Sequence, residues 1–398
     1  MSGLWYYHAM SRVRTSTPVL SNDELRARAL AYHARHAGKI EMRCTAAVTK
    51  DTLGLAYTPG VGAVAEHLTK RPQDAGLYTW RGRTVAIVSD GSAVLGLGNI
   101  GPLGALPVME GKAALFKTFA GIDAVPIVLA TQSTEEIIAT VAALAPSFGA
   151  ICLEDIAAPR CFTIEARLKD MLRIPVMHDD QHGTAIVVLA GLINAHTVVG
   201  KDIGVSRIAV IGAGAAGTAI AKLLVRFGVG DVIVVDSAGI IAASRSGTTE
   251  EKSILASSTN FERRTGGVLE AVAGADAVVG VSGPGTILSE HIRVMAQRPI
   301  VFALANPVPE IMPDEAFASG ASVVATGRSD FPNQVNNALI FPGIFQGALA
   351  RGTRAITEQT KLRAAKSLAA LVAHPTASKI LPTLFDRRVV KAVAASVR

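Results

Sequence analysis

Two pairs of adjacent acids, each placed directly after a short apolar run, are the residues best suited to chemistry. Glu154 and Asp155 follow the run at 149–153, and Asp179 and Asp180 follow the run at 174–178. Apolar runs of this length, bounded by Gly or Pro, are typical of buried strands, and an open parallel sheet binds ligands at the carboxyl ends of its strands. Carboxylates gathered at one sheet edge repel one another unless a cation lies among them, and hard oxygen ligands suit Mg²⁺ or Mn²⁺. The pattern therefore predicts a divalent-metal site.

Lys112 is a candidate base for the same site. Most lysines are solvated surface charges, but this one follows Glu110-Gly111 near the start of a largely apolar predicted helix over residues 110–119. Its amine can then point toward the carboxyl edge of the sheet, where partial desolvation would lower its pKa and let it act as a base. Tyr57 lies just before the Pro59-Gly60 turn. A lone tyrosine there is usually structural, and an acid–base role is the rarer alternative.

A glycine-rich turn between a predicted strand and a predicted helix indicates a dinucleotide site. The strand covers residues 207–211, the helix covers 218–227, and the turn between them reads Gly212-Ala213-Gly214-Ala215-Ala216-Gly217. The glycines permit a tight turn and a close approach of a pyrophosphate, and the helix N-terminus stabilises the phosphate charge. The next predicted strand, 232–235, ends in Asp236, which would accept from a ribose 2′-hydroxyl and repel a 2′-phosphate. Because Ser237 and Ala238 supply no cation, the pattern favours NAD, with NADP as the alternative.

Polar residues also follow the later predicted strands. Ser282 follows residues 277–281, Asn306 lies just beyond 299–303, and an amide run that contains Asn336 and Asn337 lies beyond 322–325. Strand ends on this face point at the cofactor, and an asparagine can both donate to and accept from a nicotinamide or a substrate oxygen. Ser282 and Asn306 are therefore candidate cofactor contacts. The amide run has a structural alternative, since such runs commonly form turns.

The elements that must position these residues alternate between strand and helix. Predicted strands at 84–89, 125–130, 150–153 and 174–177 are separated by predicted helices at 110–119, 134–144 and 163–172, and the second series of strands begins at 207. Further helices are predicted at 21–36, at 183–195 and from residue 344 to the C-terminus. This rhythm predicts parallel sheets covered by helices on both faces. The fold class is therefore α/β with two domains, each a mainly parallel sheet flanked by helices, the second of Rossmann type.

Composition and charge narrow the class of protein. With 398 residues, of which 49% are hydrophobic and 18% charged, the chain can bury more than one core. The net charge of +7 invites a nucleic-acid interpretation, but the basic residues are scattered, so an enzyme that attracts anionic ligands explains the charge equally well.

Three widely spaced cysteines, Cys44, Cys152 and Cys161, suit a reducing compartment. The apolar stretches 92–109 and 183–200 are broken by Gly, Pro or polar residues and do not fit membrane spans. Residues 1–20 are faintly similar to a transit peptide, but a disordered tail before a start at Met10 is favoured.

From about Gly38 to its C-terminal helices the chain resembles the malic enzymes, in particular the short bacterial type. Seven motifs in order carry the resemblance: Tyr-Thr-Pro-Gly-Val at 57–61, Ser-Asp-Gly-Ser-Ala-Val-Leu-Gly-Leu-Gly-Asn-Ile-Gly at 89–101, Met-Glu-Gly-Lys at 109–112, Leu-Glu-Asp-Ile at 153–156, His-Asp-Asp-Gln at 178–181, Phe-Ala-Leu-Ala-Asn-Pro at 302–307 and Gln-Val-Asn-Asn at 334–337. The resemblance implies metal-dependent oxidative decarboxylation of (S)-malate to pyruvate and CO₂ with reduction of NAD or NADP. It implies these roles: Tyr57 as general acid, Lys112 as general base, Glu154, Asp155 and Asp180 as ligands of Mn²⁺ or Mg²⁺, and Asn306, Asn336 and Asn337 as malate contacts.

The resemblance also implies an organisation that is not linear. Residues 1–178 would form a substrate and metal domain with an N-terminal dimerisation segment, and residues 179–336 would form the dinucleotide domain. The helices of residues 337–398 would pack back on the substrate domain. The implied state is a cytoplasmic homodimer, in which Tyr57 can reach the partner's site.

Two departures from the larger malic enzymes bear on the site. The larger enzymes carry an arginine in the glycine-rich loop, where this chain has Ala93 and Val94, which makes Ser92 a candidate substrate anchor. His182 stands where the larger enzymes commonly have a glutamine. Two alternative functions remain open: a malolactic-type or oxaloacetate decarboxylase that retains NAD, and an inactive NAD-binding regulator. The intact cluster of mutually repelling acids argues against the regulator.

Overall fold

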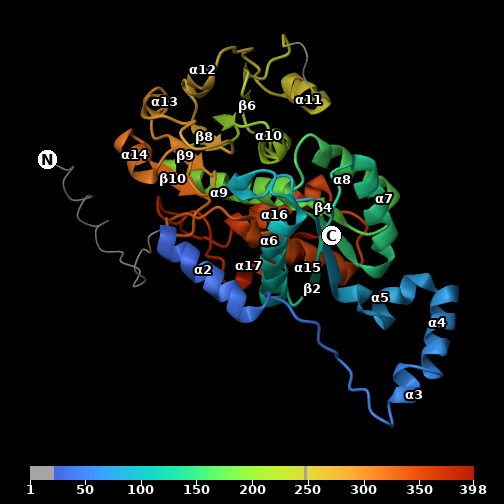
Figure 1. Cartoon of the computed structure of the whole chain (residues 1–398). Helices are drawn as coiled ribbons and strands as arrows, with labels where there is room; N and C mark the ends of the chain where they lie inside the picture. Colours follow the sequence, from blue (N-terminus) through green and yellow to red (C-terminus); the bar gives the residue numbers. More distant parts are fainter. Residues whose placement is uncertain (1–21, 246–248) are drawn as a thin grey trace. The chain divides into compact units, whose positions relative to one another are not determined.

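The computed structural model of the chain describes residues 22–245 and 249–398 (Figure 1). The chain divides into two compact units, one ending at Arg43 and the other running from Cys44 to Arg398. The first unit contains the helix α2 (Asn22–His36), which has acids in its first turn and basic residues in its last, as the helix dipole favours. The helix predicted at 21–36 is thus confirmed from Asn22 onward. The predictions for residues 1–20 lie outside the described residues.

The first sheet of the second unit carries the metal-site acids. Its four strands are parallel in the order β2-β1-β3-β4: β1 (Thr84–Ser89), β2 (Asp123–Val128), β3 (Ala150–Leu153) and β4 (Val176–His178). The helices between them are α6 (Gly101–Leu115), α7 (Thr134–Leu144) and α8 (Arg160–Met171), and α6 continues into a π-helical turn, Phe116–Ala120. Alternate residues of β1 enter different cores, Val85 and Ile87 on one face and Ala86 and Val88 on the other.

The second sheet carries the glycine-rich turn. Its order is β10-β9-β8-β5-β6-β7, parallel except for the short antiparallel edge strand β7. The strands are β5 (Arg207–Ile211), β6 (Asp231–Asp236), β7 (Gly239–Ile240), β8 (Ala277–Gly280), β9 (Ile300–Ala303) and β10 (Val323–Thr326). The helices are α10 (Ala215–Phe227), α11 (Glu250–Ser258), α12 (Val268–Val272), α13 (Ser289–Arg293) and α14 (Pro313–Ala318). The predicted α/β class, with two mainly parallel sheets flanked by helices, is confirmed.

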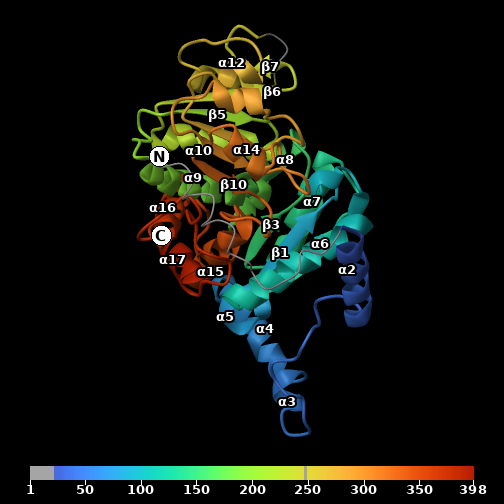
Figure 2. The same ribbon diagram turned by 90° about the vertical axis from the view of Figure 1, so that its left-hand side faces the viewer.

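One long helix, α9 (Asp179–Val199), links the two sheets. It starts at the acids and packs against α10 of the second sheet and against α16 (Glu358–Ala369) of the C-terminal segment (Figure 2). One hydrophobic core contains residues of β1, α9, β5 and the C-terminal helices, so both sheets share it. Among the described residues, α9 alone is long and apolar enough to cross a membrane, but 72% of its most apolar stretch is buried inside the protein, as in the core helix of a folded domain.

Of the C-terminal helices α15 (Phe341–Arg351), α16 and α17 (Arg388–Ser396), α15 packs against the π-helical turn that follows α6, α16 packs against α9, and α17 packs against α15 and α16. The ring of Phe116 lies 4.7 Å from that of Phe341 and 5.5 Å from that of Phe345, measured between centroids. The side chain of Gln346 donates to the carbonyl of Ala120 over 2.9 Å. The residues that form these contacts are far apart in the sequence, and the contacts place Phe341 beside the end of α6.

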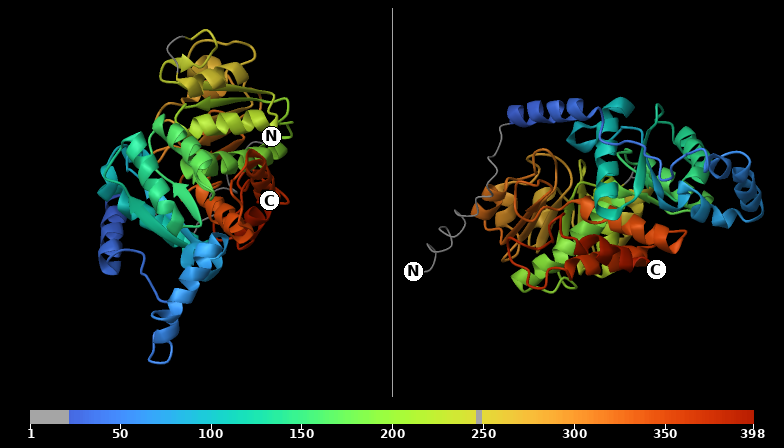
Figure 3. Two further views of the ribbon diagram at one scale, coloured as in Figure 1. Left: turned by 90° about the vertical axis from the view of Figure 1, so that its right-hand side faces the viewer. Right: turned by 90° about the horizontal axis from the view of Figure 1, so that it is seen from below.

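A separate group of short helices precedes β1. It comprises α3 (Leu53–Ala56), α4 (Gly60–Lys70) and α5 (Ala75–Tyr78), with short 3₁₀ turns between and after them. None of the residues of these three helices is buried. In Figures 1 and 3, α3 and α4 extend outward from the first sheet and its helices. We call residues 53–70 the arm.

Candidate functional site

Three predicted ligands meet at the carboxyl edge of the first sheet. Glu154 and Asp155 follow β3, Asp180 lies in the first turn of α9, and one carboxylate oxygen from each lies within 4.8 Å of the others. Asp155 has a left-handed backbone (φ 53°), which turns the chain sharply after the strand. Its N–H donates to Asp180 Oδ2 over 2.8 Å, which fixes the two acids relative to each other.

The chemistry of this cluster fits a hard divalent cation. Glu154 and Asp155 are each 4% exposed, so their charges are largely removed from water. Burial, followed by the charge of Asp180, raises the pKa of Glu154 well above its usual range, against the opposing effect of Lys112. Within the described part of the chain, Glu154 Oε2 is buried and has no hydrogen-bond partner. A Mg²⁺ or Mn²⁺ ion would give this buried oxygen a partner and would offset the repulsion between the carboxylates.

Lys112 lies in the same cluster. From the last turn of α6 its Nζ is 2.7 Å from Glu154 Oε1, forms an ion pair with Asp179 and lies 4.2 Å from the centre of the Phe341 ring. Burial would lower the pKa of Lys112, but the charges of Asp179 and then Glu154 outweigh it, so the pKa lies well above its ordinary value. The expected lowering of the Lys112 pKa is therefore wrong for this arrangement of charges, because desolvation was considered without the surrounding carboxylates.

The start of α9 is held by a buried polar network that the sequence did not reveal. Glu165 of α8 accepts from the N–H of His178 over 2.9 Å and bonds to His182 Nε2 over 2.8 Å. On the other side of the ring, Lys361 Nζ is 2.9 Å from His182 Nδ1. An ammonium can only donate, so His182 accepts at Nδ1 and donates at Nε2. This neutral form agrees with a His182 pKa lowered to about 4 by burial and by Lys361, against the opposing effect of Glu165.

Ser92, the predicted substrate anchor, is engaged within its own loop. Its hydroxyl donates to Asp90 Oδ1 over 2.5 Å and accepts from the N–H of Ala157 over 2.8 Å and from Arg160 over 3.1 Å. Arg160 also bonds to the buried carboxylate of Asp90 over 2.8 Å. Arg160 was not singled out from the sequence, although it follows the Glu-Asp pair on the first turn of α8. The Arg160 guanidinium offsets the negative charge of Asp90 in this loop.

Tyr57 does not join the cluster within one chain. It ends α3 on the arm and is 67% exposed, whereas Lys112 is 7% exposed. The predicted acid and the predicted base are thus brought together only if something else places Tyr57 near Lys112.

The three asparagines lie on loops beside the acids and the second sheet. Asn306 is exposed just beyond β9. Gly96, in the loop after β1, lies so close to Asn306 that a Cβ on Gly96 would be 2.0 Å from the Asn306 carbonyl oxygen. Asn336 accepts from the N–H of Ala338 over 2.8 Å and so caps the short helix Asn337–Leu339. A Cβ at Gly183 of α9 would approach Asn337 to 3.1 Å, which places Asn337 against the helix that carries Asp179 and Asp180.

The glycine-rich turn has the backbone of a dinucleotide site. Gly212 has φ 115°, and a side chain there would strike the carbonyl of Val281, while a Cβ on Gly217 would lie 1.8 Å from the Gly212 oxygen. Gly214 faces open space and directly precedes the first residue of α10, Ala215. Ala213 and Ala216 are half-buried beside the glycines. The turn therefore offers the N–H groups of a helix N-terminus and free room in front of Gly214.

Two acids support this site, one buried and one half-buried. Glu310 is fully buried and accepts from the N–H of Ser282 over 2.9 Å and from that of Ala305 over 3.0 Å, which ties together the loops after β8 and β9. Glu310 was not singled out from the sequence. Asp236 ends β6 as predicted, but it carries two cations that the sequence analysis did not foresee: Arg245 and Lys252 both bond to its carboxylate.

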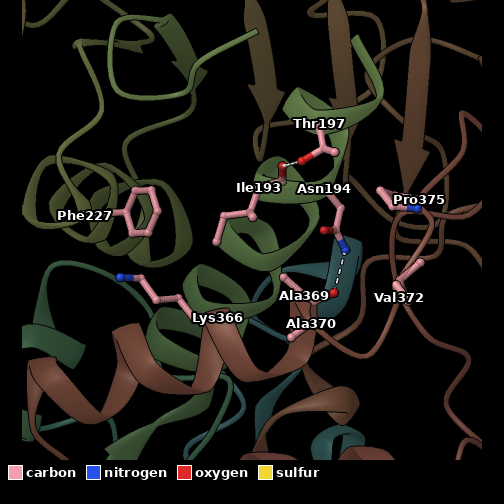
Figure 4. Close-up of a pocket in the computed structure, with 10 residues that line it drawn as sticks. Ile193, Asn194, Thr197, Phe227, Lys366, Ala369, Ala370, Val372 and Pro375 are labelled. Atoms are coloured by element: carbon pink, nitrogen blue, oxygen red, sulfur yellow. Dashed lines mark hydrogen bonds between the residues drawn. The ribbon is translucent and has the colours of Figure 1, made fainter. Parts of the chain in front are cut away.

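A surface pocket of about 480 Å³ lies elsewhere, between the C-terminal halves of α9 and α10 and the end of α16. Figure 4 shows Phe227 and Lys366 on one side of it and Asn194 donating to the carbonyl of Ala369. Asn194 also donates to the carbonyl of Ile380 over 2.8 Å, so its amide holds the C-terminal segment on α9. The residues that line this pocket include none of the predicted site residues.

Comparison with known proteins gives concordant results along almost the whole chain. The family models described as "Malic enzyme, N-terminal domain" and "Malic enzyme, NAD binding domain" match residues 37–138 and 181–398. The bifunctional malic/malolactic enzyme of Bacillus subtilis is 50% identical over 94% of this chain and 92% of its own length, and the NADP-dependent malic enzyme of Halomonas elongata is 47% identical over 90% and 85%. The crystal structure of the NAD-dependent malic enzyme of Thermotoga maritima matches with a TM-score of 0.90 and 48% identity, covering 93% of this chain and 98% of that one.

Proposed function

The chain belongs to the malic enzyme family, and from this premise we propose that it converts (S)-malate to pyruvate and CO₂ while reducing NAD or NADP. The observation that carries the proposal is the buried contact of Lys112 with Glu154, in a cluster that also brings Asp155 and Asp180 within ligand distance. Relatives named as NAD-dependent and as NADP-dependent malic enzymes support both cofactors.

The proposed metal ligands are Glu154, Asp155 and Asp180. Their oxygen donors and their burial support Mn²⁺ or Mg²⁺ over softer ions. When bound, the metal would polarise the C2 oxygen of malate and offset the negative charge of the acids, and the nicotinamide would supply the hydride acceptor. The cluster would then hold the substrate beside Lys112.

Lys112 is proposed as the general base that takes the proton of the C2 hydroxyl. With the field of the acids offset, its burial favours the neutral amine, which is the form a base needs. Asp179, in contact with Lys112, fixes the position of its amine. Tyr57 is proposed to protonate C3 of the enol that remains after CO₂ leaves. Lys112 gains the hydroxyl proton and Tyr57 loses the proton delivered to C3, so the reaction has no net proton change, and transfer of a proton from Lys112 to Tyr57 would return both residues to their starting states.

We further propose that Tyr57 acts in the site of a partner subunit in a homodimer. The arm on which it lies exposes Leu53, Leu55 and Val61 at 49%, 77% and 42%. Exposed aliphatic side chains on short helices without buried residues are typical of a surface that another subunit covers. The N-terminal segment as a whole would then serve dimerisation, as the resemblance implies.

The remaining assignments follow the same division of the chain. Residues 1–178 are proposed as the substrate and metal domain and 179–336 as the dinucleotide domain, with residues 337–398 packed back on the first; the contact between Gln346 and Ala120 supports this. The proposed malate contacts are Ser92, Asn306, Asn336 and Asn337. The proposed cofactor contacts are Asp236, Ser282, Asn306 and the 212–217 turn. Three free cysteines support a cytoplasmic location.

The second candidate is a malolactic reaction, favoured by the 50% identity to a bifunctional malic/malolactic enzyme. Both candidates consume malate, but only the first releases reduced cofactor. The test is to add malate, Mn²⁺ and NAD to the purified protein and to measure NADH, pyruvate and lactate. Equal amounts of NADH and pyruvate support the first candidate, and lactate without NADH supports the second.

A further inference from the structure

Three polar side chains from three helices form a network at the first turn of α9. Glu165 of α8 accepts from the N–H of His178 over 2.9 Å, and its other oxygen lies 2.8 Å from His182 Nε2. Lys361 of α16 donates to Nδ1 of the same ring over 2.9 Å. Glu165 and Lys361 are 5% and 2% exposed, and neither is among the residues proposed to touch malate, cofactor or metal. We call Glu165, His182 and Lys361 the α9 support.

The α9 support holds the chain on both sides of a proposed metal ligand. Asp180 lies between His178 and His182, and Glu165 bonds to the backbone of the first and to the side chain of the second. The side chain of His178, at the N-cap position of α9, makes no capping bond, so the helix start is not fixed by a cap of its own. Asp180 is half-buried and accepts from the N–H of Asp155. Its position relative to the other two ligands therefore depends on how the support holds the residues that flank it.

The burial of Lys361 is better explained by its contact with His182 than by the stability of α16. Taking an ammonium out of water is unfavourable, and an apolar side chain of similar volume is often at least as stable in such a place. Lys361 recovers part of this loss from Glu358 on the same helix, but Glu358 is 44% exposed, so water screens that ion pair. The remaining described contact of the ammonium is the one that places the His182 ring.

The support requires one acceptor and one donor from the side chain at position 182. The His182 ring accepts from Lys361 at Nδ1 and donates to Glu165 at Nε2. A glutamine amide offers the same pair, an oxygen that accepts and an N–H that donates. His182 stands where the larger malic enzymes commonly have a glutamine. Either side chain can make both contacts, so the support depends on hydrogen bonding and not on the charge of an imidazole.

We propose that Glu165 and Lys361 are positioning residues that act through His182 to hold Asp180 at the metal site. The proposal rests on the proposed function only for the role of Asp180 as a metal ligand. It gives the C-terminal segment a part in metal binding, because α16 supplies Lys361 although it contributes none of the proposed ligands. Loss of the support should loosen the first turn of α9 and weaken metal binding while the rest of the fold is retained.

The test is a Mn²⁺ titration of the metal-free full chain without substrate, in which free Mn²⁺ is followed by electron paramagnetic resonance. Lys361→Met should weaken Mn²⁺ binding by about tenfold or more, as expected for a residue that orients a metal ligand. The melting temperature of the metal-free variant should change little, because methionine fills much of the same volume and needs no partner. Lys366→Met is the matched control on the same helix: its ammonium lies over the Phe227 ring, and it should leave the Mn²⁺ affinity unchanged.

Two variants at position 182 separate positioning from a purely structural role. His182→Gln keeps an acceptor and a donor and should stay within about threefold of the wild-type Mn²⁺ affinity, whereas His182→Leu keeps neither and should lose about tenfold or more. This comparison decides the question if Lys361→Met does not fold.

Unchanged Mn²⁺ affinity in Lys361→Met and His182→Leu would overturn the proposal, and so would a His182→Gln variant that binds as weakly as His182→Leu. These results leave the proposed function intact, because the wild-type protein still binds Mn²⁺. A wild-type protein that binds no Mn²⁺ would instead overturn the metal site of the proposed function, and this inference with it.

Discussion

The ammonium of Lys112 lies 2.7 Å from the carboxylate of Glu154, and this contact joins the helix after β1 to the end of β3. The Phe341 ring, from the C-terminal segment, packs 4.2 Å from the same ammonium. Three distant parts of the chain therefore determine the surroundings of one amine. Its reactivity depends on how the charge of the acids is balanced.

Replacing Lys112 should abolish the proton transfer without removing the cofactor site. Lys112→Met should lower kcat with malate by about 10²–10⁴-fold, the usual contribution of a positioned base. Binding of NADH, followed by its fluorescence, should be unchanged because the 212–217 turn is not altered. Lys117→Met is the matched control, since Lys117 is 62% exposed and pairs with Asp123. Normal turnover of Lys112→Met would remove Lys112 from the mechanism.

If Tyr57 serves the partner's site, two inactive variants should complement each other. Tyr57→Phe and Lys112→Met are each expected to be inactive, but a heterodimer of the two contains one site with both native residues. Random re-association of a one-to-one mixture should restore about a quarter of wild-type activity, because half of the dimers are mixed and each has one intact site. A mixture that stays inactive, although native mass spectrometry shows mixed dimers, would place Tyr57 and Lys112 in the same subunit's site.

The ion pairs of Asp236 predict a pH dependence of stability. Burial would raise the Asp236 pKa, but hydrogen bonds from Arg245 and Lys252 lower it to about 2. A lowered folded-state pKa gives stability that is present above the unfolded value of about 4 and is lost as the pH falls toward 2. Asp236→Asn should therefore lower the melting temperature at pH 5 to 7 and make little difference near pH 2. A gap between the two melting curves that does not shrink on acidification would contradict this.

Glu310 should act on cofactor binding through the loops that it ties together. Glu310→Ala leaves the N–H groups of Ser282 and Ala305 without their acceptor and should cost about 1–3 kcal/mol in the free energy of unfolding. KM for NAD should rise more than kcat falls, because the residue orients loops and does not touch the reacting atoms. Glu310→Gln, which keeps one carbonyl oxygen, should recover part of the KM. Glu315→Gln, an exposed acid bonded to Ser289, is the control and should change neither quantity.

Regular local patterns made much of the fold predictable. The strands 84–89, 150–153 and 207–211 and the helix 134–144 have the predicted bounds. Each strand is a short, mainly apolar run. The Ser133 side chain caps the helix by accepting from the N–H of Glu136. The helix predicted to open near Glu110 begins at Gly101, because Pro102 falls in the first turn, where its missing N–H costs nothing, and Ala105 and Met109 are buried.

The predictable part of the site is the part set by strand order. Acids after β3 and β4 meet because neighbouring parallel strands end at one edge, so the sequence alone brought Glu154 and Asp180 together. The other contacts join residues far apart in sequence, as when Lys361 reaches His182 or Lys252 reaches Asp236. No local periodicity encodes such contacts. The direction of the Lys112 pKa was missed for the same reason, since it depends on the charges of Asp179 and Glu154 as well as on burial.

We propose that Glu154, Asp155 and Asp180 hold one divalent cation on which malate oxidation depends. The most direct measurement titrates the metal-free protein with Mn²⁺ and follows bound Mn²⁺ by electron paramagnetic resonance and NADH by absorbance in the same samples. Both signals should rise together to one Mn²⁺ per chain, and Asp180→Asn should shift both to Mn²⁺ concentrations at least about tenfold higher. Glu135→Gln, which alters an exposed acid on α7, should shift neither. Full turnover without a divalent cation, or unchanged Mn²⁺ binding by Asp180→Asn, would contradict the account.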